Sequence, residues 1–140
     1  MSANGEHIIP MLSYENGIAA MEWLSKAFGF SEKEKMLDDN GNLAHGELAW
    51  GDSIIILATP TRDYQCPKHH REICEDAAKW SEVPYIINGV LIFVDDIEKH
   101  YQRVKEFGVT FLSDIETGGP AARYRAEDLE GQRWMFMQKD

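Results

Sequence analysis

The chain has 140 residues, of which 44% are hydrophobic and 27% are charged, and its formal net charge is −10. These values are ordinary for one soluble globular domain, and no apolar run is long enough to cross a bilayer. The acidic balance excludes nucleic acid as an expected partner, because phosphate binding needs a clustered basic face. A polar start at 1–6 and only two cysteines, Cys66 and Cys74, lead us to expect a cytoplasmic protein with free thiols and no membrane partner.

The first half of the chain predicts a β-α-β-β-β order. Pro10 lies inside the first apolar run, which indicates an edge strand, and Gly29 ends a segment with apolar residues at helical spacing. Turn-forming residues at 38–42 and at Gly51-Asp52 then separate three further strands. The predicted elements are strand 7–14, helix 18–28, strand 32–37, strand 43–50 and strand 53–59.

The second half predicts the same order again. Asp95-Asp96 caps a helix that ends at Gly108, and a Gly-rich loop at 118–120 precedes the last two strands. The predicted elements are strand 89–94, helix 97–107, strand 110–113, strand 123–127 and strand 133–138. Between the halves, apolar residues at helical spacing from Ile73 to Trp80 predict one short amphipathic helix over 70–80.

Short segments recur along the chain at a spacing of 79 to 80 residues. Phe28-Gly29 returns as Phe107-Gly108, and the turn glycine Gly51 returns as Gly131. Two copies at constant spacing indicate two modules that stack. We therefore predict an α+β fold of two βαβββ modules whose curved mixed sheets surround a shared cleft. The expected limits are 7–60 for the first module, 61–88 for a connecting segment, and 89–140 for the second module.

The two-residue turn at Gly51-Asp52 fixes which side chains share a face. It places Glu47 opposite Ile56, so that these residues and His45 point toward the cleft, whereas Leu48 and Leu57 point toward the helix. The same alternation directs further side chains into the cleft from other strands. These are Met11, Leu91, Phe93, Arg123, Arg125, Arg133 and Met135.

The paired modules, together with the turn Asp128–Gly131 before the last strand, resemble the vicinal oxygen chelate superfamily. This superfamily includes glyoxalase I, extradiol dioxygenases, fosfomycin resistance enzymes and bleomycin resistance proteins. The resemblance implies a glyoxalase/bleomycin resistance-like fold and a homodimer. It also places the family's metal-ligand positions on side chains that cannot hold a hard divalent cation, so it implies a metal-lacking branch with no cofactor. Those positions are Ile9, Ile56, Gly89 and Met135.

The function expected from this pattern is metal-independent binding of a small amphipathic or aromatic molecule in the cleft. The predicted ligand-binding residues are Met11, Ile56, Trp80, Leu91, Phe93, Arg123, Arg125, Arg133 and Met135. The alternative is a lyase or isomerase of the glyoxalase-like type, in which Glu47 and His45 transfer a proton. A third possibility is an inert relative that serves in regulation or assembly.

Two further questions stay open at this level. The arginines could capture a carboxylate of the ligand, or they could pair with a protein carboxylate such as Glu47. A metal is not expected, but two sets of side chains could in principle hold one. These sets are His7 with His45 and Glu47, and Cys66 with His69, His70 and Cys74.

Overall fold

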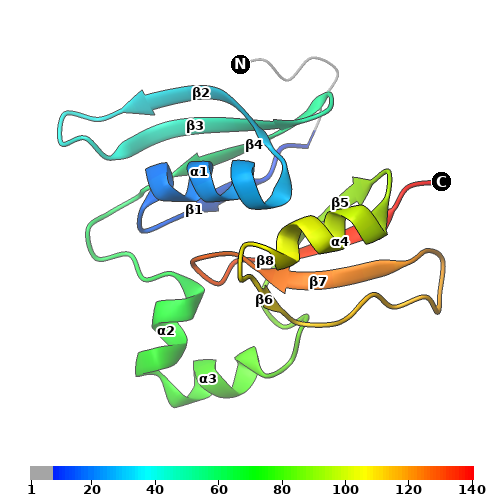
Figure 1. Cartoon of the computed structure of the whole chain (residues 1–140). Helices are drawn as coiled ribbons and strands as arrows, with labels where there is room; N and C mark the ends of the chain where they lie inside the picture. Colours follow the sequence, from blue (N-terminus) through cyan, green and yellow to red (C-terminus); the bar gives the residue numbers. More distant parts are fainter. Residues whose placement is uncertain (1–7) are drawn as a thin grey trace. The chain divides into compact units, whose positions relative to one another are not determined.

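The computed structural model describes residues 8–140 of the chain. The chain forms two compact units, the first ending at Tyr64 and the second running from Gln65 to Asp140. Each unit contains an open four-stranded mixed sheet with a helix packed on it (Figure 1). The predicted α+β class and the repeated βαβββ order are both confirmed.

In the first unit the sheet order is β1-β4-β3-β2, with β1 parallel to β4 and the other pairs antiparallel. The predicted register of the hairpin is confirmed, because Trp50 pairs with Ser53 and Glu47 with Ile56. The elements are β1 (Met11–Ser13), α1 (Gly17–Phe28), β2 (Ser31–Leu37), β3 (Leu43–Trp50) and β4 (Ser53–Ala58).

Helix α1 covers one face of this sheet. The side chain of Asn16 caps its start by accepting a hydrogen bond from the backbone N–H of Ala19, and Gly29 ends it with a left-handed φ of 101°. Met21 of the helix is fully buried, and a Cβ at Gly46 of β3 would lie only 2.5 Å from its sulfur. A side chain at this point of β3 would therefore displace the end of the Met21 side chain.

In the second unit the order is β5-β8-β7-β6, again with one parallel pair, β5 with β8. Met11 pairs with Ile56 in the first sheet, and Leu91 pairs with Met135 in the second. The sequence repeat is thus also a repeat of strand pairing. The elements are α2 (Pro67–Ile73), α3 (Glu75–Ser81), β5 (Gly89–Val94), α4 (Ile97–Lys105), β6 (Thr110–Phe111), β7 (Arg123–Glu127) and β8 (Arg133–Gln138).

The structure differs from the predicted elements mainly in three places, one being the strand predicted over 110–113, which is only Thr110–Phe111. The single helix predicted over 70–80 is two short helices, because Cys74 has an extended backbone and the acidic residues Glu75 and Asp76 start a new first turn. The strand predicted over 7–14 is reduced to Met11–Ser13 within the described residues. Pro10, which lacks an N–H donor, lies directly before it.

Each unit buries its own apolar layer between helix and sheet. Leu24, Leu48 and Leu57 are fully buried in the first unit. In the second unit Phe136 is fully buried and its ring lies 4.4 Å from the ring of His100 on α4. None of the helices in the described part of the chain combines the length and apolar character of a membrane span.

Candidate functional site

The sheet of the second unit carries two parallel rows of mixed apolar and basic side chains on one face. One row is Leu91, Met135 and Arg125, and the next is Phe93, Met137 and Arg123. Since Phe136, between the two methionines, packs against α4, these rows lie on the opposite face. Leu91 is 46% exposed and Phe93 is 51% exposed, so large apolar groups are presented to solvent beside guanidinium groups.

The third arginine on this face has a different environment. Arg133 is 3% exposed, and its Nη2 donates to Glu127 at 2.9 Å. It also donates to the carbonyls of Val83 and Ser81, each at 2.6 Å. Of the two interpretations left open by the sequence, pairing with a protein carboxylate is the one seen for Arg133. The carboxylate is Glu127, and the suggested partner Glu47 is bonded to His45 instead.

Arg71 completes this buried network from α2. Its two terminal nitrogens bond both carboxylate oxygens of Glu127, at 2.6 and 2.9 Å. Burial alone would raise the pKa of Glu127, but the hydrogen bonds from Arg71 and Arg133 outweigh burial, and the pKa is lowered. The network therefore holds a charged carboxylate and ties the residues around α2 and α3 to the end of the second sheet.

Arg123 and Arg125 are not neutralised in this way. Nη1 of Arg123 donates to the carbonyls of Gly118 and Ala121, which carry no net charge. The Arg125 side chain makes no hydrogen bond or ion pair within residues 8–140, and it is half-buried. Two positive groups thus flank the exposed apolar side chains without a paired carboxylate.

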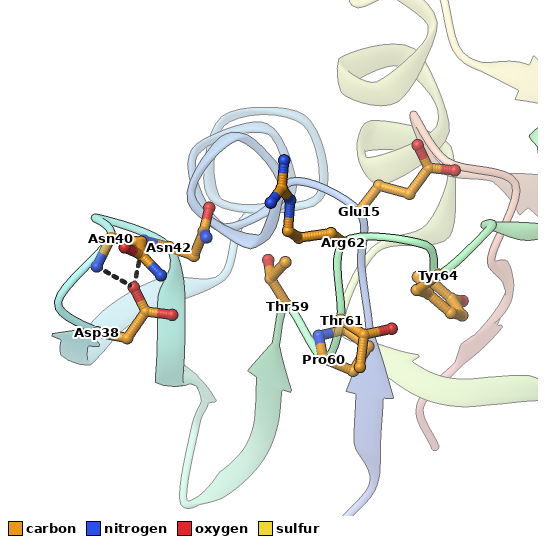
Figure 2. A pocket seen from close by; sticks show the side chains of 9 residues that line it. All are labelled: Glu15, Asp38, Asn40, Asn42, Thr59, Pro60, Thr61, Arg62 and Tyr64. Atoms are coloured by element: carbon orange, nitrogen blue, oxygen red, sulfur yellow. Dashed lines mark hydrogen bonds between the residues drawn. The ribbon is translucent and has the colours of Figure 1, made fainter.

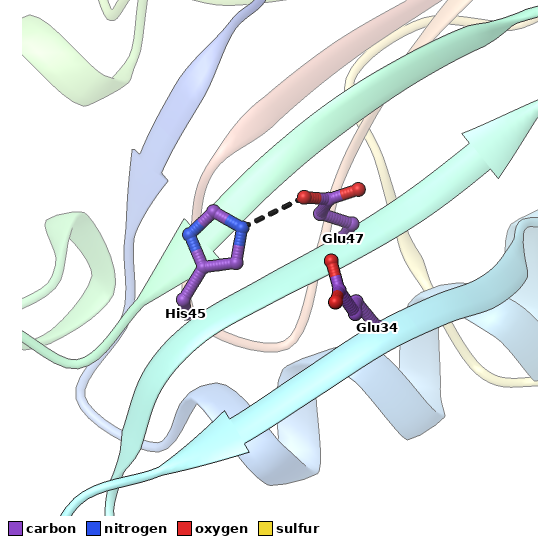
Figure 3. Close-up of side chains that lie close together, drawn as sticks. All are labelled: Glu34, His45 and Glu47. Carbon is purple, nitrogen blue, oxygen red and sulfur yellow. Dashed lines mark hydrogen bonds and ion pairs between the residues drawn. The ribbon is translucent and has the colours of Figure 1, made fainter. Parts of the chain in front are cut away.

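In the first unit, the two predicted catalytic residues and a third side chain lie together. Nε2 of His45 lies 2.8 Å from Oε2 of Glu47, which is 1% exposed, whereas His45 is 31% exposed. Glu34 reaches the same place from β2, as Figure 3 shows. Sequence reasoning missed Glu34. The distance between Nε2 of His45 and Oε2 of Glu47 is short enough for a proton to pass between them. The catalytic role of these residues stays a prediction.

The remaining predicted residues are distributed over both units. Met11 is 77% exposed and shares a row with the half-buried Ile56, which pairs in turn with Glu47. Trp80 is 53% exposed on α3 of the second unit.

Of the two side-chain sets that could in principle hold a metal, one includes His7, which lies outside the described residues. Both cysteines are free thiols. Within residues 8–140, Glu34, His45 and Glu47 are the one group whose ligand atoms come close enough to hold an ion, so the Cys66–Cys74 segment does not form such a group.

A polar cavity that sequence reasoning also missed lies in the first unit (Figure 2). Its volume is about 460 Å³. Asp38 of the β2–β3 turn is committed to the backbone N–H groups of Asn40 and Asn42, at 2.8 and 3.0 Å. The polar residues 38–42 predicted the turn between two strands, but nothing in their pattern indicated a cavity beside it. The lining residues are Glu15, Asp38, Asn40, Asn42, Thr59, Pro60, Thr61, Arg62 and Tyr64.

Comparison with known proteins assigns the class. Residues 10–136 match the family model of the glyoxalase/bleomycin resistance protein/dioxygenase superfamily. The chain therefore belongs to this superfamily, which confirms the resemblance seen in the sequence. A search of curated proteins gave no match.

Solved structures share the fold over nearly the whole chain. TioX from Micromonospora sp. ML1 is 22% identical with a TM-score of 0.71, and the match covers 96% of this chain and 98% of TioX. TnmS3, an antibiotic binding protein from Streptomyces sp. CB03234, is 15% identical with a TM-score of 0.63, covering 96% and 98%. The fosfomycin resistance protein FosX from Listeria monocytogenes is 9% identical with a TM-score of 0.64, covering 96% and 93%.

The positions at which the resemblance places the family's metal ligands do not suit a divalent ion in this chain. Ile56 and Met135 lie on the open faces of their sheets, and Gly89 has no side chain. An isoleucine offers no donor atom and a thioether is a soft, weak ligand for a hard cation.

Proposed function

We propose that the protein binds a small amphipathic molecule, aromatic and carrying an anionic group, without needing a metal. The binding surface is the open sheet face of the second unit. The single observation that supports this most is the row Leu91, Met135 and Arg125, in which an exposed apolar group and an unpaired guanidinium lie on one face.

The chemistry of the face favours such a ligand over a purely apolar one. Methionine side chains adapt to irregular apolar shapes, and Phe93 and Leu91 supply flat and branched contact area. A guanidinium binds a carboxylate through two parallel hydrogen bonds, so Arg125 and Arg123 would orient the anionic end. Arg133 is left out of this proposed role because its donors are used by Glu127 and two backbone carbonyls.

The relatives support the same class of function. TnmS3 is described as an antibiotic binding protein and FosX as a fosfomycin resistance protein. Both share the fold, and we extend from them the idea that this chain captures a small molecule. The proposal does not depend on which antibiotic or metabolite is bound.

The test is calorimetric titration of the full chain with a panel of aromatic carboxylic acids and their neutral amides, in the presence of a chelator. We expect the acids to bind and the amides to bind at least about tenfold more weakly, because a charge-assisted hydrogen bond is lost. Arg125→Met should weaken binding of the acids to the same extent, since the methionine keeps the apolar stem but not the charge. Arg103→Met, on α4 of the same unit, is the matched control and should bind like the wild type.

Two results would overturn the proposal. One is equal binding of acids and amides, which would mean that Arg125 does not recognise an anion. The other is binding of the acids that is seen without the chelator and is absent in its presence, which would show that the ligand is held through a metal.

A further inference from the structure

Glu34, His45 and Glu47 form a cluster in the first unit that the proposed ligand face does not use. Their ligand atoms all lie within 4.8 Å of one another. The side chains come from two neighbouring strands, Glu34 from β2 and the other two from β3, and they approach one another on the sheet (Figure 3). The cluster combines an imidazole nitrogen with two carboxylates.

A β-bulge in β2 creates this arrangement. Glu32 pairs with Leu48, and the next pair is Glu34 with Glu47, so Lys33 is the extra residue. Uninterrupted pairing would have placed Lys33 opposite Glu47 and formed a favourable pair of opposite charges. The bulge instead sets two carboxylates directly opposite each other, which is destabilising unless a positive charge lies between them. Bulges often occur next to functional sites, where they redirect a side chain in this way.

The three side chains of the cluster together carry a net negative charge. Two carboxylates contribute two negative charges, and one imidazole contributes at most one positive charge. Glu47 is 1% exposed, and its neighbours in the row across the sheet, Ile56 and Met11, are apolar. Carboxylate oxygens and imidazole nitrogen are donors that zinc accepts, and a cation would be attracted to the net negative charge of these three side chains.

We propose that Glu34, His45 and Glu47 bind a divalent transition-metal ion, with Zn²⁺ as the ion that suits this donor set. Zinc takes imidazole nitrogen and carboxylate oxygen at roughly 2.0–2.2 Å, so two donors on one ion lie at most about 4.4 Å apart. Glu34 is exposed, and rotation of its side chain closes the remaining distance. Three protein ligands leave a coordination position for water, as in zinc sites that act on a bound molecule.

This site differs from the family's metal positions, which fall on Ile56 and Met135 among others. It lies within one module, on β2 and β3, and it shares no residue with the ligand face of the second unit. It therefore goes beyond the proposed function. Zinc binding and ligand binding can each fail while the other holds.

The experiment is calorimetric titration of the chelator-treated full chain with ZnCl₂ alone. We expect one zinc per chain. Glu34→Gln and His45→Gln should each lower the affinity at least about tenfold, since removal of even an outer-shell partner of a metal ligand has an effect of this size. Glu34 is exposed, so its variant is expected to fold normally, and the thermal unfolding of each variant checks this.

Glu32→Gln is the matched control, because Glu32 lies on the same strand but pairs with Lys35 on the other side of the bulge. It should bind zinc like the wild type. A Cys66→Ser/Cys74→Ser variant should also keep its affinity. The proposal is overturned if zinc does not bind, if Glu32→Gln and Glu34→Gln lose the same affinity, or if the cysteine variant alone loses it.

Discussion

Glu47 and Arg125 occupy corresponding places in the two sheets, and they carry opposite charges. Glu47 pairs with Ile56, which pairs with Met11, and Arg125 pairs with Met135, which pairs with Leu91. The other members of both rows are apolar, so these two rows differ mainly in the sign of one charged side chain. An acidic row corresponds to the proposed zinc site, and a basic row to the proposed anion-binding face.

Glu127 is the residue whose loss should affect stability most. Glu127→Gln removes the charge that compensates the buried Arg133, and we expect the free energy of unfolding at neutral pH to fall by about 3 kcal/mol. Urea denaturation measures this. Glu72→Gln, an exposed change on α2, is the control and should alter stability by no more than about 0.5 kcal/mol.

The same carboxylate predicts a pH dependence. Because the folded-state pKa of Glu127 is lowered below its ordinary 4.5, its contribution is present above that value and is lost as the pH falls through the lower folded-state pKa. The difference between wild type and Glu127→Gln should therefore shrink as the pH is lowered to about 3. An undiminished difference at that pH would show that the charge of Glu127 is not the stabilising feature.

At the scale of elements, two turns have the same internal bonding but different surroundings. Oδ1 of Asp38 and Oδ1 of Asp128 each accept from the backbone N–H groups two and four residues later, at 2.8 to 3.0 Å. Both turns contain a glycine with positive φ, 82° at Gly41 and 88° at Gly131. The second turn is bonded to a helix, since the N–H of Lys68 at the start of α2 donates to the carbonyl of Glu130 at 3.0 Å, whereas a Cβ at Gly41 of the first turn would meet no atom within 4 Å.

A comparison of these two turns separates the cost of backbone strain from the cost of a steric clash with a neighbouring helix. Gly41→Ala should cost about 1 kcal/mol, because an alanine is strained at positive φ but its Cβ would meet no atom within 4 Å. Gly131→Ala should cost about 2–4 kcal/mol, because its Cβ would lie 2.7 Å from the backbone nitrogen of Lys68. Thermal or urea unfolding of both variants gives the comparison. Equal losses would mean that α2 moves away from the turn without cost.

The sequence predicted those features that are determined by neighbouring residues, and it did not predict those that depend on residues far away in the chain or on a bulge. The hairpin at Gly51-Asp52 fixed the register of β3 and β4, and alternation then separated Leu48 from Glu47 correctly. The place of Glu34 could not be read from alternation, because one extra residue in β2 changes every pairing after it. The partners of Arg133 were equally hidden, since Ser81 and Val83 lie about 50 residues away in an irregular segment.

At the scale of the whole molecule, the segment expected to connect the modules is largely part of the second unit. Arg71 on α2 reaches Glu127, and Arg133 reaches the carbonyls of Ser81, the last residue of α3, and of Val83. The division into two compact units falls near the start of this segment, after Tyr64. The two modules are thus unequal in construction, since the second includes two additional helices.

This division predicts how a destabilising change spreads. In Glu127→Gln, amide hydrogen exchange should become faster in α2, α3 and the second sheet, while β3 and β4 of the first unit keep their protection. The reason is that the side-chain partners of Glu127 among residues 8–140, Arg71 and Arg133, lie in the second unit. Mass spectrometry of peptides after exchange measures both groups. An equal loss of protection in the two units would show that the chain unfolds as one cooperative body.

The exposed edge strand β2 affects the concentration at which this protein can stay free of aggregates. It is exposed along its whole length, it lies at the edge of its sheet, and four of its seven residues are charged. Charged edges discourage strands of neighbouring molecules from adding to the sheet and starting aggregates. The proposed function, capture of one ligand per chain, requires at least as many protein molecules as ligand molecules. The charged edge at β2 would limit aggregation at the high protein concentration that this requires.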